Sequence, residues 1–216
     1  MYKAYVLPIF DDFSGHGTAI AGIIAGKNIK ESSIVGINSN IELYSIKVMD
    51  GDNTAPLSRV IKGIYKALEY DVDISNMSFG TTVDSSALYQ AIKEVSDKDI
   101  LIIASAGNNG KDTGEVEYPA GYEEVLAVGS VDSNGEIAQS SSQGEQVDVW
   151  APGEFVKTRA AFGLETVNSG TSIATPHVVG MASLIWQKDK NKSSDFVRGL
   201  IEDSAKVIKK NQRNIK

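Results

Sequence analysis

The wholly apolar run Ile100–Ala104 is the feature that most constrains how this chain can fold. A strand with one face in water alternates apolar and polar residues, whereas a strand buried on both faces is apolar throughout. Residues 56–70, by contrast, place Val60 and Ile64 on one face of an amphipathic helix. Buried strands that alternate with such helices are typical of an α/β fold, in which helices flank a mainly parallel central sheet.

The same alternation continues along the chain, and turn residues such as Gly51 and Asn53 separate the segments. We find no internal repeat and no linker, which predicts a single domain over residues 1–216 with a basic tail at about 208–216. We expect strands at residues 42–48, 74–77, 100–104, 125–131 and 147–150, and helices at residues 18–25, 56–70, 85–96, 172–187 and 194–207.

Composition limits the partners of this chain. Its 21 basic and 28 acidic residues give a net charge of -7, which repels phosphate backbones and anionic lipids, so we expect no nucleic acid and no membrane as partners. The absence of cysteine excludes disulfides and a cysteine nucleophile. Residues 1–10, broken by Pro8, do not resemble a secretory signal. We therefore expect a cytoplasmic protein, unless a leader upstream of this sequence directs it to secretion.

Five short segments carry the residues that suggest chemistry. The segments are Gly-His-Gly-Thr-Ala-Ile-Ala-Gly at 15–22, Ile-Ser-Asn-Met-Ser-Phe-Gly at 74–80, Ala-Ser-Ala-Gly-Asn at 104–108, Tyr-Pro-Ala at 118–120 and Gly-Thr-Ser-Ile-Ala-Thr-Pro-His-Val-Val-Gly at 170–180. In this order they resemble the subtilisin-like serine proteases, and the resemblance extends from about Asp12 to about Ala205. It implies a three-layer subtilisin-like fold and the hydrolysis of peptide bonds through an acyl-enzyme.

Ser172 follows a Gly-Thr pair and opens an apolar helical run. Unpaired backbone N–H groups at such a position can face a developing oxyanion. A serine before an apolar run is also a common helix cap, and it is the resemblance that identifies Ser172 as the nucleophile. The resemblance also implies that His16 is the general base. The other histidine, His177, lies five positions after Ser172 on the same helix, about 140° around its axis, so it cannot easily reach the serine hydroxyl.

The resemblance implies a further donor and a substrate pocket. Asn108 corresponds to the side-chain donor of an oxyanion hole, while its simpler interpretation is a turn asparagine. We expect the pocket shape around Phe79 and Asn109 to determine specificity, and we expect a peptide or protein substrate that pairs as an added strand. The residues that resemble the pocket edges are Ser78, Phe79, Gly80, Ala106 and Gly107.

The third catalytic residue of such proteases, an aspartate, ends a core strand some tens of residues before the histidine, but only 15 residues precede His16. Asp12 corresponds to an acid that is not the triad member, and Asp73 to a structural acid before a strand. Asp11 would serve only if residues 4–10 formed a core strand, which Pro8 opposes because it removes a ladder hydrogen bond. We therefore expect the triad aspartate to be missing and the activity to be impaired.

Three states fit this sequence: a fragment of a full protease, a protein completed by another chain, or a catalytically degenerate pseudoprotease that binds an extended peptide or partner protein. Loss of a core strand leaves a strand edge uncovered, which predicts self-association through that edge. We expect no cofactor and no metal. A structural calcium ion is the alternative, because residues 28–40 carry oxygen-bearing side chains.

Overall fold

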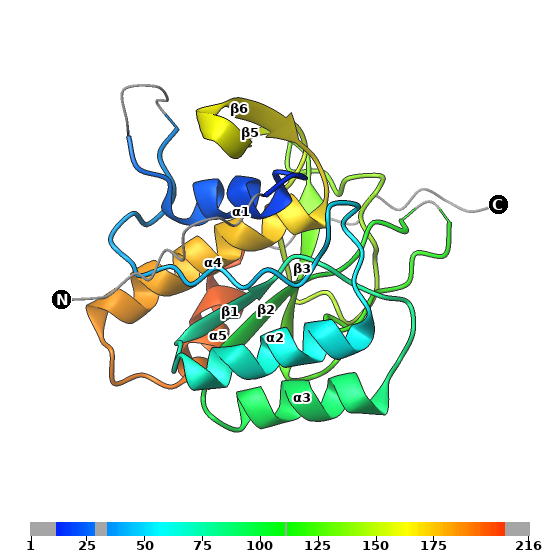
Figure 1. The fold of residues 1–216 in the computed structure, drawn as a ribbon, viewed down its shortest axis with the longest axis vertical. Coiled ribbons are helices and arrows are strands. Elements are labelled where there is room, and N and C mark those ends of the chain that lie inside the picture. The colour runs from blue at the N-terminus through cyan, green and yellow to red at the C-terminus, as the bar shows by residue number, and fades with distance from the viewer. Residues whose placement is uncertain (1–11, 29–33, 111, 206–216) are drawn as a thin grey trace.

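The computed structural model describes residues 12–28, 34–110 and 112–205 (Figure 1). Its helices are α1 (His16–Ala25), α2 (Leu57–Glu69), α3 (Ser86–Ser96), α4 (Thr171–Lys188) and α5 (Ser194–Ser204), with a short 3-10 turn at Ala161–Gly163. Its strands are β1 (Ile74–Met77), β2 (Leu101–Ser105), β3 (Val125–Val131), β4 (Val149–Pro152), β5 (Val156–Arg159) and β6 (Glu165–Asn168).

The central sheet is parallel, as the apolar strands predict. Its order is β1-β2-β3-β4, and Ile102 of β2 lies opposite Val125 of β3. β5 and β6 form a separate antiparallel hairpin, which the sequence analysis did not anticipate. Within the described residues, β1 is the edge strand next to β2, so its outer side carries no ladder.

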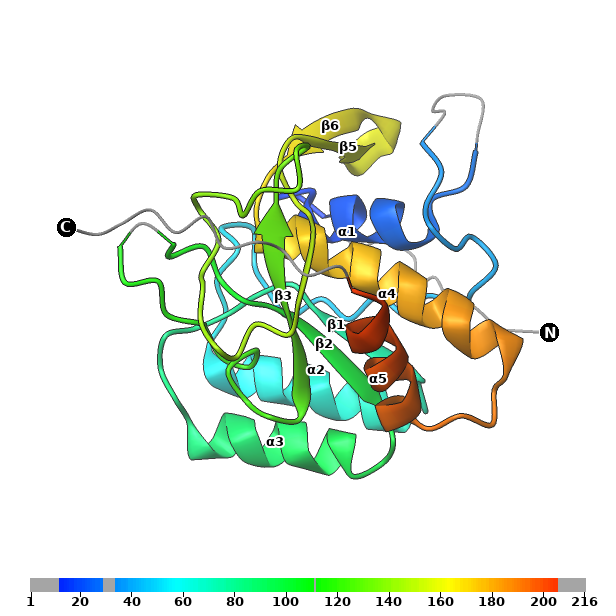
Figure 2. The same cartoon turned by 180° about the vertical axis from the view of Figure 1, so that it is seen from behind.

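Helices cover both faces of the sheet, which explains why its strands are apolar throughout. Leu101 and Ile103 of β2 pack in the cluster that includes side chains of α4 and α5. Ile102 and Ala104 point to the other face and pack with side chains of α2 and α3. Figures 1 and 2 show these two layers on opposite sides of the strands. The expected three-layer α/β arrangement is therefore confirmed.

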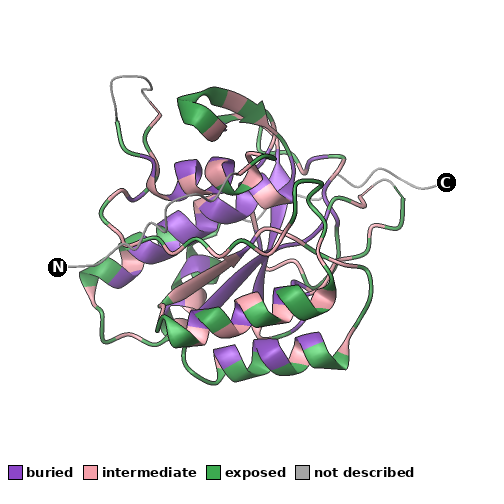
Figure 3. Ribbon diagram, viewed as in Figure 1, coloured by how far each residue is buried: buried purple, intermediate pink, exposed green. Residues whose placement is uncertain are grey.

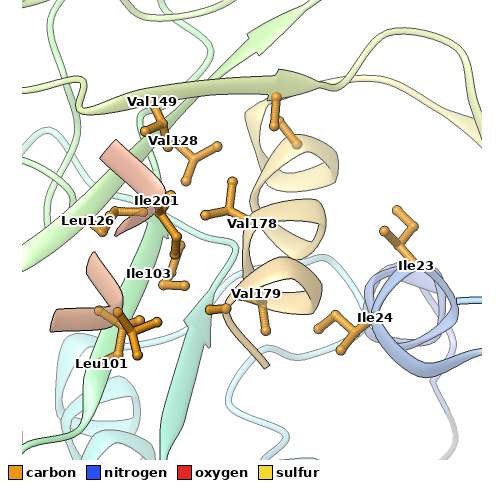
Figure 4. Close-up of a cluster of buried hydrophobic side chains, with 14 of the residues drawn as sticks. Ile23, Ile24, Leu101, Ile103, Leu126, Val128, Val149, Val178, Val179 and Ile201 are labelled. Atoms are coloured by element: carbon orange, nitrogen blue, oxygen red, sulfur yellow. The ribbon is translucent and has the colours of Figure 1, made fainter. Parts of the chain in front are cut away.

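Helix α1 forms an outer element that packs on α4. Its isoleucines join the α4 cluster, where Ile23 and Ile24 lie on the side of α4 away from the strands (Figure 4). The buried stripe of α1 faces α4, while the hairpin of β5 and β6 above it is largely exposed or intermediate (Figure 3). Helix α1 is therefore held by side-chain packing on α4 and by contacts with β5.

The prediction of a strand at residues 42–48 is wrong, because the structure has no strand there. A strand needs a neighbour that pairs with its N–H and C=O groups. A groove of about 930 Å³ is lined both by residues 40–50 and by Ile74, Ser75 and Asn76 of β1, so these two segments do not form a ladder. The alternating pattern of residues 42–48 thus has the character of a strand but lacks a partner.

Candidate active site

Two strand ends and two helix starts meet at one edge of the sheet. β1 and β2 are parallel neighbours, so the residues that follow them, 78–80 and 106–108, emerge at the same edge. The N-terminal ends of α1 and α4 lie side by side in both Figure 1 and Figure 2. This arrangement brings the sequence motifs around His16 and Ser172 to one face of the protein.

Ser172 lies in the first turn of α4, which begins at Thr171. The residue before the helix, Gly170, has φ 131°, a backbone conformation that favours glycine. The N–H groups of Ile173 and Ala174 both donate to Gly170 O, whereas that of Ser172 has no acceptor among the described residues. In the described structure, the start of α4 therefore presents the N–H of Ser172 without an acceptor, next to the Ser172 side chain.

Asn108 is fixed by the residue that precedes Ser172. Its Oδ1 accepts from the N–H of Thr171 at 3.0 Å and from Thr171 Oγ1 at 3.3 Å. Thr171 is fully buried, and its Oγ1 also accepts from Gly107 N at 3.2 Å. Because Oδ1 is occupied, the amide nitrogen Nδ2 of Asn108 is the group left to donate elsewhere. The sequence analysis did not assign this positioning role to Thr171, although the Gly-Thr-Ser motif contains it.

His16 is the first residue of α1 and lies at the end of β1. Its Nε2 is 3.2 Å from Ser78 O, and since a carbonyl only accepts, Nε2 carries the proton in this contact. No hydrogen bond joins His16 to Ser172 within the described residues. The imidazole must therefore turn before it can accept a proton from Ser172, and catalytic hydrogen bonds are often formed only when substrate binds.

Asp12 binds the start of α1 rather than the imidazole. Its Oδ1 accepts from Gly15 N at 3.0 Å, and its Oδ2 accepts from both the N–H and the hydroxyl of Thr18 at 2.7 Å. Burial alone would raise the pKa of Asp12, but hydrogen bonds from Thr18, Ser14 and Gly15 together lower it. Asp12 thus caps the helix that begins at His16.

The other acids considered from the sequence do not reach His16 in the described residues. Asp73 precedes β1, at the end of that strand remote from Ser78. Burial, and then the neighbouring charge of Asp71, raise the pKa of Asp73. Asp11 and the proposed strand at residues 4–10 lie outside the described residues. No acid therefore orients the imidazole in the part of the chain that the structure describes.

The two expected walls of the substrate pocket lie beside each other. Ser78, Phe79 and Gly80 follow β1, and Ala106 and Gly107 follow β2. Ser105 Oγ donates to Phe79 O at 3.5 Å and links the walls. The side chain of Phe79 packs against the α2 and α3 cluster, while its backbone oxygen faces the second wall through the contact with Ser105.

The comparisons with known proteins agree with this geometry. The sequence matches the subtilase family over residues 6–215. The chain belongs to the subtilase family. It is 36% identical over 201 residues to a thermostable alkaline protease of Halalkalibacterium halodurans, covering 93% of this chain and 55% of that protein. It is 37% identical over 196 residues to subtilisin DY of Bacillus licheniformis, covering 90% and 71%.

A solved structure confirms the subtilisin-like fold of this subtilase. The crystal structure of a cold adapted subtilisin-like serine proteinase has a TM-score of 0.81 and 30% sequence identity, and the match covers 89% of this chain and 68% of that chain. The subtilase spans about half the length of several curated relatives it matches, such as the 52% of subtilisin E of Bacillus subtilis.

His177 forms a hydrogen bond within helix α4 of this subtilase. Its Nδ1 donates to Ile173 O, one turn earlier in α4, at 3.0 Å. Burial lowers the pKa of His177, against the opposing effect of its hydrogen bonds to Ile173 and Ala174. The ring therefore stays neutral inside the fold at neutral pH.

Two further expectations concern metals and membranes. Residues 12–28, 34–110 and 112–205 contain no group of three or more His, Asp or Glu side chains placed to hold a metal ion. Part of the calcium alternative, residues 29–33, lies outside the described residues. Among the described helices, none combines the length and apolar character that crossing a membrane requires.

Proposed function

We propose that this subtilase is a serine endopeptidase that hydrolyses peptide bonds through an acyl-enzyme at Ser172, with His16 as general base and Asn108 in the oxyanion hole. The observation that carries this proposal is the pair of donors beside Ser172. Thr171 occupies the Asn108 oxygen and leaves its Nδ2 to donate, and the N–H of Ser172 has no acceptor among the described residues. Two such donors suit a tetrahedral oxyanion.

The reaction follows from these positions. His16 releases Ser78 O, turns toward Ser172 and accepts the proton of its hydroxyl while Oγ attacks the scissile carbonyl. The oxygen of the tetrahedral intermediate takes the negative charge and accepts from Asn108 Nδ2 and Ser172 N. The imidazolium then gives its proton to the leaving amine as the C–N bond breaks. Water, activated by the same imidazole, hydrolyses the acyl-enzyme.

Turnover depends on whether an acid orients His16. A serine protease without its triad aspartate is slower by about 10⁴ in kcat, which is about 5.5 kcal/mol of barrier. About 10³ or more over water remains from binding and the oxyanion hole, a figure established for subtilisin, a member of this family. We therefore expect slow cleavage by Ser172 if no acid reaches His16.

The alternative function is a pseudoprotease that binds an extended peptide or partner protein without cutting it. One observation favours it: His16 Nε2 is engaged with Ser78 O, and no acid contacts the imidazole among the described residues. In this case the pocket walls and the groove along β1 would bind a peptide as an added strand.

A serine-directed fluorophosphonate separates the two functions. A working Ser172–His16 pair should be labelled rapidly, and a panel of fluorogenic peptides should be cleaved. Both signals should disappear in Ser172→Ala, and both should persist in Ser133→Ala, a matched change at an exposed turn serine. Equal background signals from the native protein and Ser172→Ala would refute the endopeptidase proposal and support the pseudoprotease.

A further inference from the structure

Glu117 lies between the two segments that are expected to form the pocket walls. Its N–H donates to Ala106 O at 2.8 Å, which fixes it to the wall that follows β2. The next residue, Tyr118, exchanges two hydrogen bonds with Thr81, at 2.8 and 2.9 Å, just beyond the wall that follows β1. The backbone of Glu117 therefore bridges both walls.

The side chain of Glu117 projects between the glycines of these walls. A Cβ atom on Gly80 would lie 2.8 Å from Glu117 Cβ, and one on Gly107 would lie 2.7 Å from Glu117 Cγ. Real Cβ atoms do not come this close to other heavy atoms. Glycine at both positions thus makes room for the Glu117 side chain between the two expected walls.

Within residues 12–28, 34–110 and 112–205, one oxygen of the Glu117 carboxylate has a neutral partner and the other accepts no hydrogen bond. Asn109 Nδ2 donates to Oε1 at 2.7 Å, and this bond fixes the orientation of the carboxylate. Oε2 faces Gly80 and accepts no hydrogen bond in the described part of the chain. No lysine or arginine forms a salt bridge with Glu117 among the described residues. Among the described residues, which leave out Lys111, the negative charge between the two walls is therefore not compensated by a cation.

We propose that Glu117 makes the primary pocket selective for a basic side chain, so that the subtilase cleaves after lysine or arginine. This inference rests on the proposed function and deepens it by naming the substrate class. The same residues, 106–108, form one pocket wall and carry the oxyanion donor Asn108, so a side chain between the walls belongs to the residue whose carbonyl Ser172 attacks. Its ammonium or guanidinium group would bind Glu117 Oε2 in a charge-assisted hydrogen bond.

Paired substrates give a direct test. Arginine and citrulline have nearly the same shape, and only arginine is charged. A hydrogen bond to a charged group changes affinity by roughly 10- to 150-fold, so we expect kcat/KM for an arginine peptide to exceed that for the citrulline peptide by this factor. In Glu117→Gln, which keeps an oxygen for Asn109 Nδ2, the ratio should fall close to one.

A matched control removes the same charge elsewhere. Glu115 lies two residues earlier and is exposed, so Glu115→Gln should keep the native arginine-to-citrulline ratio. A native ratio near one, or a ratio retained in Glu117→Gln, would overturn the assignment. An arginine-to-citrulline ratio that falls equally in Glu117→Gln and Glu115→Gln would also overturn the assignment, because it would show a general effect of net charge.

A binding measurement keeps this inference separate from catalysis. p-Aminobenzamidine is a cation that needs no working nucleophile, and its fluorescence reports binding. We expect Glu117→Gln to weaken its binding by at least about 10-fold, with Glu115→Gln unchanged. Binding without peptide turnover would refute the endopeptidase proposal but support the role of Glu117. Equal affinities for the native protein and Glu117→Gln would overturn that role whether or not peptides are cleaved.

Discussion

Replacing Asp12 with alanine should loosen the helix that begins at His16. Oδ1 of Asp12 binds Gly15 N and Ser14 Oγ, and Oδ2 binds the N–H and hydroxyl of Thr18. These contacts cap the N-terminus of α1, together with Ser14 Oγ, which accepts from His16 N at 3.3 Å. The substitution leaves the N–H of Thr18 without its acceptor, whereas Gly15 N keeps its bond to the backbone oxygen of residue 12 at 3.1 Å.

The expected loss is that of a helix cap, about 1–2 kcal/mol in the free energy of unfolding. The charge itself adds little because Asp12 is only half-buried and solvent screens it. In a domain of this size 1 kcal/mol changes Tm by about 2–4 °C, so Asp12→Ala should lower Tm by about 2–8 °C. Asp12→Asn keeps one accepting oxygen out of two and should fall between the native protein and the alanine variant.

Thermal unfolding, followed by far-UV circular dichroism, measures the Tm of the native protein, of Asp12→Asn and of Asp12→Ala. The pKa of Asp12 is lowered from 3.8 on folding, so its ionised form stabilises the fold above pH 3.8, and this contribution is lost as the pH falls through the folded-state pKa. The difference between native and Asp12→Ala should therefore narrow in acid. A variant that melts at the native temperature at pH 7, or a difference that widens in acid, would contradict the capping role.

Three other predictions follow from single contacts. Asn108→Leu removes the side-chain donor to the oxyanion and should lower kcat by about 10²–10³ with little change in KM; a change confined to KM in steady-state kinetics would argue against that role. The pKa of His177 is lowered from 6.5 by burial, so the unfolded chain binds the proton first and the native protein should lose stability as the pH falls below about 6.5. His177→Gln should reduce this slope in denaturant titrations, and an unchanged slope would exclude His177 as its source. Ile103 of β2 is fully buried in the cluster that includes α4, so Ile103→Ala should cost about 2–5 kcal/mol in urea unfolding, and a cost under about 1 kcal/mol would mean that the site collapses around the cavity.

The apolar strands and amphipathic helices were predictable because burial determines them locally. Val125–Val131 has the expected bounds, since a strand buried on both faces leaves little choice of pattern. The hairpin of β5 and β6 was missed because its strands have four residues each and carry many polar side chains. Short, exposed antiparallel strands resemble loops in sequence.

The strand predicted at residues 42–48 is absent although its composition suits a strand. Pairing requires two segments, and β1 forms no ladder with these residues in the described structure. Local sequence describes the residues of a strand and says nothing of whether a neighbour lies beside it.

Part of the candidate site could be predicted from the sequence, and part could not. Ser172, His16 and Asn108 lie in recognisable motifs, and the structure places their segments at one edge of the sheet. The roles of Thr171 and Glu117 depend on contacts between distant segments. Glu117, for example, meets Gly80 and Gly107 only because β1 and β2 are neighbours. A single sequence shows that a glutamate is present but not what it faces.

The position of α1 has a consequence for the order in which the chain folds. This helix is made before β5 and α4, yet it packs on both of them. Thr158 Oγ1, for example, donates to Ala19 O across 139 positions of sequence, at 2.8 Å. Contacts of such long range form late and slowly. During synthesis α1 can dock only after residues 156–188 have left the ribosome, so His16 and Ser172 come together only after that point.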